Sequence, residues 1–153
     1  GISIGRRPHG LKDTARNIHE TQAFVVHIAD ETLLDPLHRS GGEFPPEVSE
    51  ADLLGLELVP SRLVAPKRLA QAPIALECRL HKVVEFGNNQ FFAGEIHLIR
   101  EDLISGTRID AGRLRPVARL GGPNYALLGE IIGMAPQSEL ASEPSAARQG
   151  AAK

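Results

Sequence analysis

The sequence has no tryptophan, one cysteine and one tyrosine, and aromatic residues make up only 4% of its 153 residues. So few aromatic side chains disfavour a platform on which nucleic-acid bases or sugars stack. The single cysteine, Cys78, excludes a disulfide framework within the chain and favours a reducing, cytoplasmic compartment. It also leaves no cysteine pair for a zinc site, and we expect no metal.

Positive and negative charges nearly balance, and the sequence contains no long apolar run. Lys and Arg number 17 against 19 Asp and Glu, a formal net charge of −2, so no basic field favours nucleic acid as a partner. No apolar run approaches the roughly 20 residues that span a bilayer, and no signal peptide is visible. These features predict a globular protein without a nucleic-acid or membrane partner.

The hydrophobic content of 42% suits one domain with its own core. We expect that domain at 1–135. The remaining residues, 136–153, have no apolar periodicity and are predicted to be a disordered tail.

Self-sufficient catalytic motifs are also absent. The six histidines form no His-Glu-x-x-His pair, and the Gly-x-Ser-x-Gly, P-loop and Gly-x-Gly-x-x-Gly patterns do not occur. Cys78 falls on the apolar face of a predicted strand, where an inert core thiol is expected. If the protein is an enzyme, a bound cofactor is expected to carry the chemistry.

Short helices are predicted between β-strands in the first third of the chain. Residues 13–22 have helical spacing that turns Ala15 and Ile18 inward, and the β-branched run 24–28 is typical of a buried strand. Asp30 is predicted to cap a helix over 31–39, which must be short, kinked or restarted because Pro36 lies within it. A second cap, Ser49, precedes a short helical turn, and 56–64 is a weak strand candidate.

The clearest β signal is a pair of long strands. Residues 74–80 alternate between apolar and polar, and the alternation slips near Lys82, which indicates a bulge. Gly87-Asn88-Asn89 supplies hairpin chemistry ahead of a partner strand over 91–100. Two long strands joined so tightly predict an antiparallel sheet that coils into a barrel. A last short element is expected at 127–134.

Residues 1–18 carry the most informative pattern, a short apolar strand end followed by a basic loop and the start of a helix. Asp13 or Thr14 is the predicted N-cap. Because the free amides and dipole of a helix start attract anions, Arg6, Arg7, Lys12 and the Thr14 hydroxyl beside it predict a phosphate cradle. The alternative from these residues alone is an ordinary capped helix beside a solvated basic loop.

Taken in order, these segments resemble the flavin reductase-like proteins, which bind FMN on a split β-barrel. The resemblance covers roughly residues 1–130 and is carried by Gly5-Arg6, Lys12 to Ile18, Phe24 to Val26, Glu43 to Pro46, Gly55 to Ser61, Pro73 to Cys78, Leu114 to Pro116, and Arg119 to Tyr125. It implies a mainly β fold, an antiparallel Greek-key split β-barrel with short helices, usually as a homodimer. Family members carry further strands ahead of the point where Gly1 stands, so the resemblance implies that the first strands are missing here.

The resemblance also implies site residues. It places the phosphate of FMN at the turn of Lys12, Asp13 and Thr14, with Arg6 as a second cation. Tyr125 is implied as a wall for the flavin ring or the substrate. A second wall is Phe44.

The function implied is that of an oxidoreductase that passes electrons from NAD(P)H through FMN to an acceptor. Two alternatives stay open: a non-catalytic flavin- or heme-binding split-barrel module, and a structural fragment without a cofactor. His27 departs from the family, whose members more often carry Asn on that strand, and this alters any polar contact made there.

Overall fold

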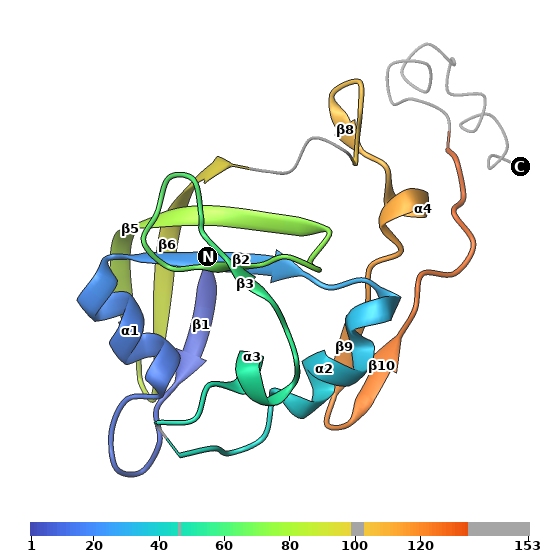
Figure 1. The fold of residues 1–153 in the computed structure, drawn as a ribbon. Helices are drawn as coiled ribbons and strands as arrows, with labels where there is room; N and C mark the ends of the chain where they lie inside the picture. Colours follow the sequence, from blue (N-terminus) through green and yellow to red (C-terminus); the bar gives the residue numbers. More distant parts are fainter. Residues whose placement is uncertain (46, 99–102, 135–153) are drawn as a thin grey trace, which may run out of the picture.

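The computed structural model describes residues 1–45, 47–98 and 103–134. Its largest sheet has the order β1–β6–β5–β2, with every neighbouring pair antiparallel. The strands are β1 (Ile2–Gly5), β2 (Ala23–Ile28), β5 (Ile74–Phe86) and β6 (Asn89–Leu98). The sheet curls strongly, so that β1 runs across the direction of β2 (Figure 1). This curled antiparallel half-barrel confirms the predicted mainly β fold class.

The long hairpin of β5 and β6 forms as its local sequence predicts. Phe86 pairs with Asn89, and Gly87 between them has φ 52°, a left-handed conformation that glycine adopts without strain. The register shifts between Leu80 and Lys82, which confirms the predicted bulge.

The helix α1 (Asp13–Thr21) covers one face of this sheet. Its Ala15 and Ile18 are buried, as predicted, against Phe24, Cys78 and Phe92. Burial of each large apolar side chain contributes about 1.5–3 kcal/mol to folding. Cys78 is buried in this core, as predicted, and burial raises the pKa of its thiol.

Close packing in this core requires a glycine on β6. A Cβ added to Gly94 would lie 2.6 Å from Cζ of Phe24 and 3.1 Å from Cβ of Cys78. The missing side chain lets the Phe24 ring lie directly against the β6 backbone.

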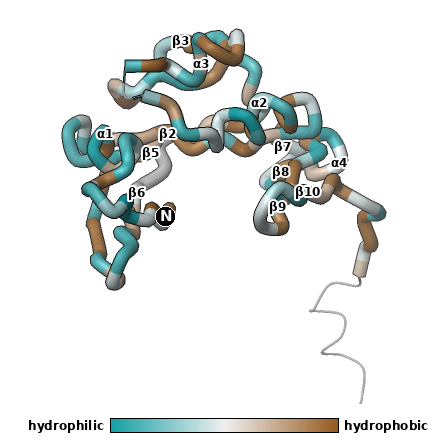
Figure 2. Tube along the Cα trace, turned by 90° about the horizontal axis from the view of Figure 1, so that it is seen from below, coloured by the Kyte–Doolittle hydropathy of each residue, from teal (hydrophilic) through white to brown (hydrophobic). Residues whose placement is uncertain are grey.

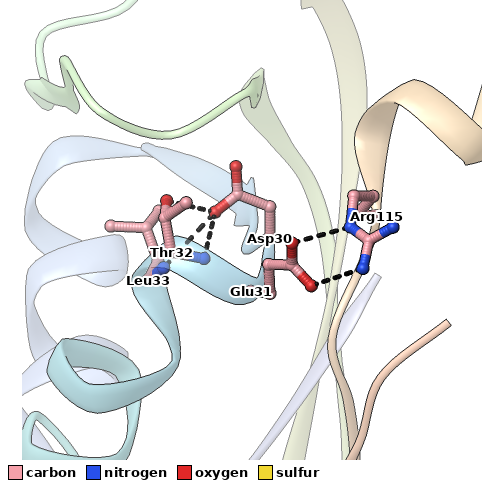
Figure 3. A network of polar contacts seen from close by, with 5 residues as sticks. All are labelled: Asp30, Glu31, Thr32, Leu33 and Arg115. Carbon is pink, nitrogen blue, oxygen red and sulfur yellow. Dashed lines mark hydrogen bonds and ion pairs between the residues drawn. The ribbon is translucent and has the colours of Figure 1, made fainter.

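The segment after β2 is a restarted helix, as Pro36 requires. A 3₁₀ turn, η1 (Glu31–Leu33), is followed by α2 (Leu34–Arg39), and Pro36 lies in the first turn of α2, where its missing amide costs nothing. Asp30 caps η1: its Oδ1 accepts from the amides of Thr32 at 3.0 Å and Leu33 at 3.3 Å (Figure 3). The predicted cap is confirmed.

Short elements complete the described chain. They are α3 (Glu50–Leu53), β3 (Leu58–Val59), β4 (Arg68–Leu69), β7 (Ile104–Ser105), β8 (Arg108–Ile109), α4 (Ala111–Leu114), β9 (Ala118–Gly121) and β10 (Asn124–Ala126). The Ser49 cap of α3 is confirmed, since its Oγ accepts from the Asp52 amide at 3.3 Å.

Two sequence predictions need correction. The weak strand over 56–64 is reduced to β3, and 127–134 contains no helix or strand. In the latter segment Ile132 is 74% exposed and Met134 is 84% exposed, so these side chains contribute little packing that would stabilise an element. The predicted tail at 136–153 lies outside the described residues.

The β9–β10 hairpin is tied to η1 although the two are far apart in sequence. Arg115 forms a bidentate ion pair with Glu31, Nε to Oε1 at 2.7 Å and Nη2 to Oε2 at 2.9 Å (Figure 3). Beside it the Val117 amide donates to the Ala29 carbonyl at 3.0 Å. Together they hold the hairpin against the 29–39 region.

This ion pair predicts a pH dependence. The hydrogen bond from Arg115 holds the pKa of the Glu31 carboxyl below its ordinary value. A carboxyl whose pKa is lowered by folding stabilises the protein fully at neutral pH, and this contribution is lost as the pH falls below about 4. Glu31→Gln should therefore be less stable than wild type at pH 7, and the difference should shrink below about pH 4.

Urea unfolding followed through the fluorescence of Tyr125, the only tyrosine in a chain without tryptophan, measures this difference. Glu130→Gln is the matched control, because Glu130 is exposed and makes no polar contact in the described part of the chain. A deficit in Glu31→Gln that stays constant between pH 7 and pH 3 contradicts the assignment.

Candidate functional site

The N-terminus of α1 differs from its prediction in one respect. The N-cap is Lys12, with φ −67° and ψ 154°, and no side chain caps the terminus. The predicted cap at Asp13 or Thr14 is wrong, because the Asp13 carboxylate is drawn to guanidinium groups instead. Its Oδ1 lies 2.5 Å from Nη2 of Arg16, and its Oδ2 lies 3.7 Å from Nη1 of Arg7. The first amides of α1 are therefore not occupied by a side-chain acceptor.

Two donors stand beside these amides. Within the described residues, the ammonium group of Lys12 makes no ion pair and the Thr14 hydroxyl makes no hydrogen bond, and both side chains are exposed. Thr14 lines a cavity of about 480 Å³, and Asn17, Thr21 and Lys67 also line it. Lys12 is not among the residues that line this cavity. The Lys12 ammonium group, the Thr14 hydroxyl and the first amides of α1 belong to the same helix start, and such a donor set suits an oxyanion.

The approach to this terminus is a tight turn. Arg7 and Gly10 exchange two backbone hydrogen bonds, of 2.9 and 3.1 Å. Gly10 has φ 137°, which only glycine adopts readily, and no atom lies within 4 Å of where its Cβ would be. The turn delivers Lys12 to the start of α1.

Arg6, the second predicted cation, forms an ion pair with Glu85. Its Nη2 donates to both carboxylate oxygens of Glu85, at 3.1 and 2.9 Å. Gln90 donates to the same carboxylate at 2.6 Å. The hydrogen bond from Gln90 and, to a smaller extent, that from Arg6 hold the pKa of Glu85 below its ordinary value. The charge of Arg6 is therefore largely offset by the Glu85 carboxylate.

Tyr125 lies elsewhere. It is on β10, and both views place β10 and α1 at opposite sides of the molecule (Figures 1 and 2). The Tyr125 hydroxyl is 3.3 Å from Nδ1 of His38, and Cζ of Arg119 lies 5.8 Å from the centroid of its ring. The structure therefore brings Lys12, Asp13 and Thr14 together and does not bring Tyr125 to them.

His27, the position that departs from the family, is a structural link. Its Nε2 accepts from the Leu69 amide at 3.0 Å, which joins β2 to β4. Burial, and secondarily the charge of Arg68, lower the pKa of His27, so the ring accepts this bond in its neutral form.

Sequence reasoning missed two residues. Lys67 faces the Thr14 cavity from a segment between two prolines, where no motif or periodicity marked it. Glu77 is fully buried on β5, and its carboxylate accepts from the amides of Arg62 at 3.0 Å and Leu63 at 2.7 Å. Its place in an alternating strand predicted a polar face, and only the loop folded over it explains its burial.

Within residues 1–45, 47–98 and 103–134, no group of three or more His, Cys, Asp or Glu side chains is arranged to hold a metal ion. In the same residues no helix has the length and apolar character needed to cross a membrane.

Comparison with known proteins bears on this site. Residues 2–108 match the model of the flavin reductase like domain. A protein of Halalkalibacterium halodurans is 39% identical over 143 residues, which cover 88% of this chain and 68% of that protein. The chain spans about two thirds of the length of several relatives that it matches.

Solved structures agree. Nitrilotriacetate monooxygenase component B from Bacillus cereus is 32% identical with a TM-score of 0.82, covering 87% of this chain and 70% of that one. The 2-nitrobenzoate 2-nitroreductase of Pseudomonas fluorescens is 30% identical with a TM-score of 0.75, covering 95% and 86%. The fold is the split barrel of flavin-related oxidoreductases, and the chain belongs to the flavin reductase-like family.

Proposed function

We propose that this chain is the FMN-binding part of an oxidoreductase that passes electrons from NAD(P)H through FMN to an acceptor. The observation that carries the proposal is the uncapped N-terminus of α1. Among the described residues, the side chains of Lys12 and Thr14 at this terminus have no polar partner. A helix terminus of this kind suits a phosphate group. Membership of the flavin reductase-like family supports a flavin as the molecule to which this phosphate group belongs.

The residues present fit the phosphate of FMN. Lys12 would supply charge, Thr14 a hydroxyl donor, and the first amides of α1 the remaining hydrogen bonds. Asp13 would not repel the phosphate strongly, because Arg7 and Arg16 offset its charge. Bound FMN would supply the hydride and electron chemistry, and the chain would bind and orient it.

Tyr125 and Arg6 have more distant roles in this proposal. Arg6 can act as a second cation for the phosphate by exchanging its exposed ion pair with Glu85, which is of the kind that stabilises little. Tyr125 can contribute to a flavin or substrate site only from the region of α2 and β9, where it packs on His38.

We also propose that the protein acts as a homodimer in the cytoplasm. Among the described residues β1 pairs only with β6, so its outer edge is available for another strand. The acceptor is proposed to be free flavin or a partner oxygenase. The likeness to a component of a monooxygenase supports the second of these.

Flavin reconstitution tests the proposal. FMN titrated into the purified chain should be quenched saturably, and NADH or NADPH added without oxygen should bleach the yellow complex. Circular dichroism checks that the chain is folded. A folded chain without saturable quenching contradicts the cofactor. A yellow complex that neither nucleotide bleaches contradicts the reductase and favours the non-catalytic binding module.

A further inference from the structure

A second cavity, of about 460 Å³, lies beside the β9–β10 hairpin and shares no residue with the Thr14 cavity. The side chains that line it come from α2, α3, β9 and the loop after α2: His38, Arg39, Phe44, Leu53, Leu54 and Arg119. No acidic residue of the described chain is among them. The volume is in the range of small-molecule sites.

The cations on this cavity are available to a ligand. Arg119 has no carboxylate partner among the described residues, and Nη2 donates only to the Gly122 carbonyl, at 3.1 Å. Arg39 lies 3.6 Å from Asp35 in an exposed pair one turn apart on α2. Such exposed pairs stabilise little, so Arg39 can exchange Asp35 for a bound anion at small cost.

Part of the cavity lining is apolar. A Cβ added to Gly42 would lie 3.1 Å from Cε2 and Cζ of Phe44, so the glycine allows the Phe44 ring to lie against the backbone. Leu53 and Leu54 extend this apolar surface. The aromatic ring of a ligand can stack on this apolar surface while a carboxylate attached to the ring pairs with the guanidinium group of an arginine of the cavity.

One side of the cavity is held in place by contacts between distant parts of the chain. His38 meets the Tyr125 hydroxyl at 3.3 Å, and the Tyr125 ring carries Arg119 on one face. The ion pair between Glu31 and Arg115 anchors the start of the same hairpin (Figure 3). These contacts fix the side of the cavity that carries His38 and Arg119 before any ligand arrives.

From this geometry we propose that the cavity lined by Phe44, Arg39 and Arg119 binds a small aromatic carboxylate. The carboxylate pairs with Arg119, assisted by Arg39, and the ring lies against Phe44. A neutral ring of the same shape lacks the charge-assisted hydrogen bonds and binds more weakly.

The probe is 4-fluorobenzoate, titrated into the full chain without FMN and followed by its ¹⁹F NMR signal. Binding should be saturable, and the neutral amide 4-fluorobenzamide should bind at least about tenfold more weakly. The absence of FMN separates this result from the proposed function, because FMN binding can fail while benzoate binding succeeds, and the reverse.

Two variants locate the site. Arg119→Gln should weaken 4-fluorobenzoate at least about tenfold, and Arg113→Gln, an exposed arginine outside the cavity, should leave it unchanged. Circular dichroism checks that both variants are folded. Equal affinity for acid and amide, unchanged binding in Arg119→Gln, equal loss in both variants, or no saturable binding overturns the proposal.

Discussion

Replacing Lys12 by alanine should weaken FMN binding about ten- to a hundredfold and change riboflavin binding by less than about twofold. Riboflavin carries the same ring without the phosphate. Lys12 is exposed, makes no ion pair among the described residues and stands at the uncapped start of α1. Its charge-assisted hydrogen bond to a phosphate is therefore lost in the variant without disturbing any protein contact.

Fluorescence titrations of both flavins measure the effect at two salt concentrations, because an exposed phosphate contact weakens as salt rises. Thr14→Val, which removes the hydroxyl and keeps the shape, should act in the same direction with a smaller change. Arg108→Ala removes an exposed cation from β8, remote from α1, and should change neither flavin. Equal losses for FMN and riboflavin in Lys12→Ala would show that the phosphate is held elsewhere.

Replacing Glu77 by alanine should lower the free energy of unfolding by about 2–5 kcal/mol. The Glu77 side chain is fully buried, and its carboxylate accepts from the amides of Arg62 and Leu63. Without it both amides lose their acceptor and β5 gains a cavity. The nearby hydrogen bond from Arg79 to the Leu63 carbonyl, 3.4 Å long, is too weak to hold the loop by itself.

Urea unfolding, followed by circular dichroism, measures this loss. Glu77→Gln should lose less, because its amide oxygen still accepts from the loop. Glu130→Ala, an exposed glutamate without a polar contact in the described chain, should stay within about 0.5 kcal/mol of wild type. If Glu77→Ala is as stable as Glu130→Ala, the carboxylate does not anchor the loop.

Local features of this fold could be predicted from the sequence. The hairpin at Gly87, the bulge near Lys82 and the caps at Asp30 and Ser49 all formed where expected. Each depends on side-chain period, on a left-handed turn residue or on a side-chain oxygen two or three residues from its amide. Such effects act over a few residues and are present in the sequence itself.

The candidate site was predictable only in part. The basic turn before α1 predicted an anion site, and the structure places Lys12 and Thr14 at the uncapped start of α1. The cap was wrong because Asp13 has a choice between an amide of its own helix and two guanidinium groups, and the ion pairs with Arg7 and Arg16 prevailed. That choice depends on how the turn ending at Gly10 presents Arg7, which spacing along the chain does not reveal.

By itself, the sequence determined β2, the long hairpin of β5 and β6, the inward face of α1 and the family. Only the tertiary structure decided which charged and polar side chains are paired with another side chain and which can still bind a ligand. Arg6 is paired with Glu85, which is 79 residues away, and Tyr125 joins His38, which is 87 residues away. Glu77 is buried by a loop 15 residues before it. The physical reason is that ion pairing and burial depend on distances between side chains, and the folded sheet sets these distances over separations at which sequence periodicity carries no information.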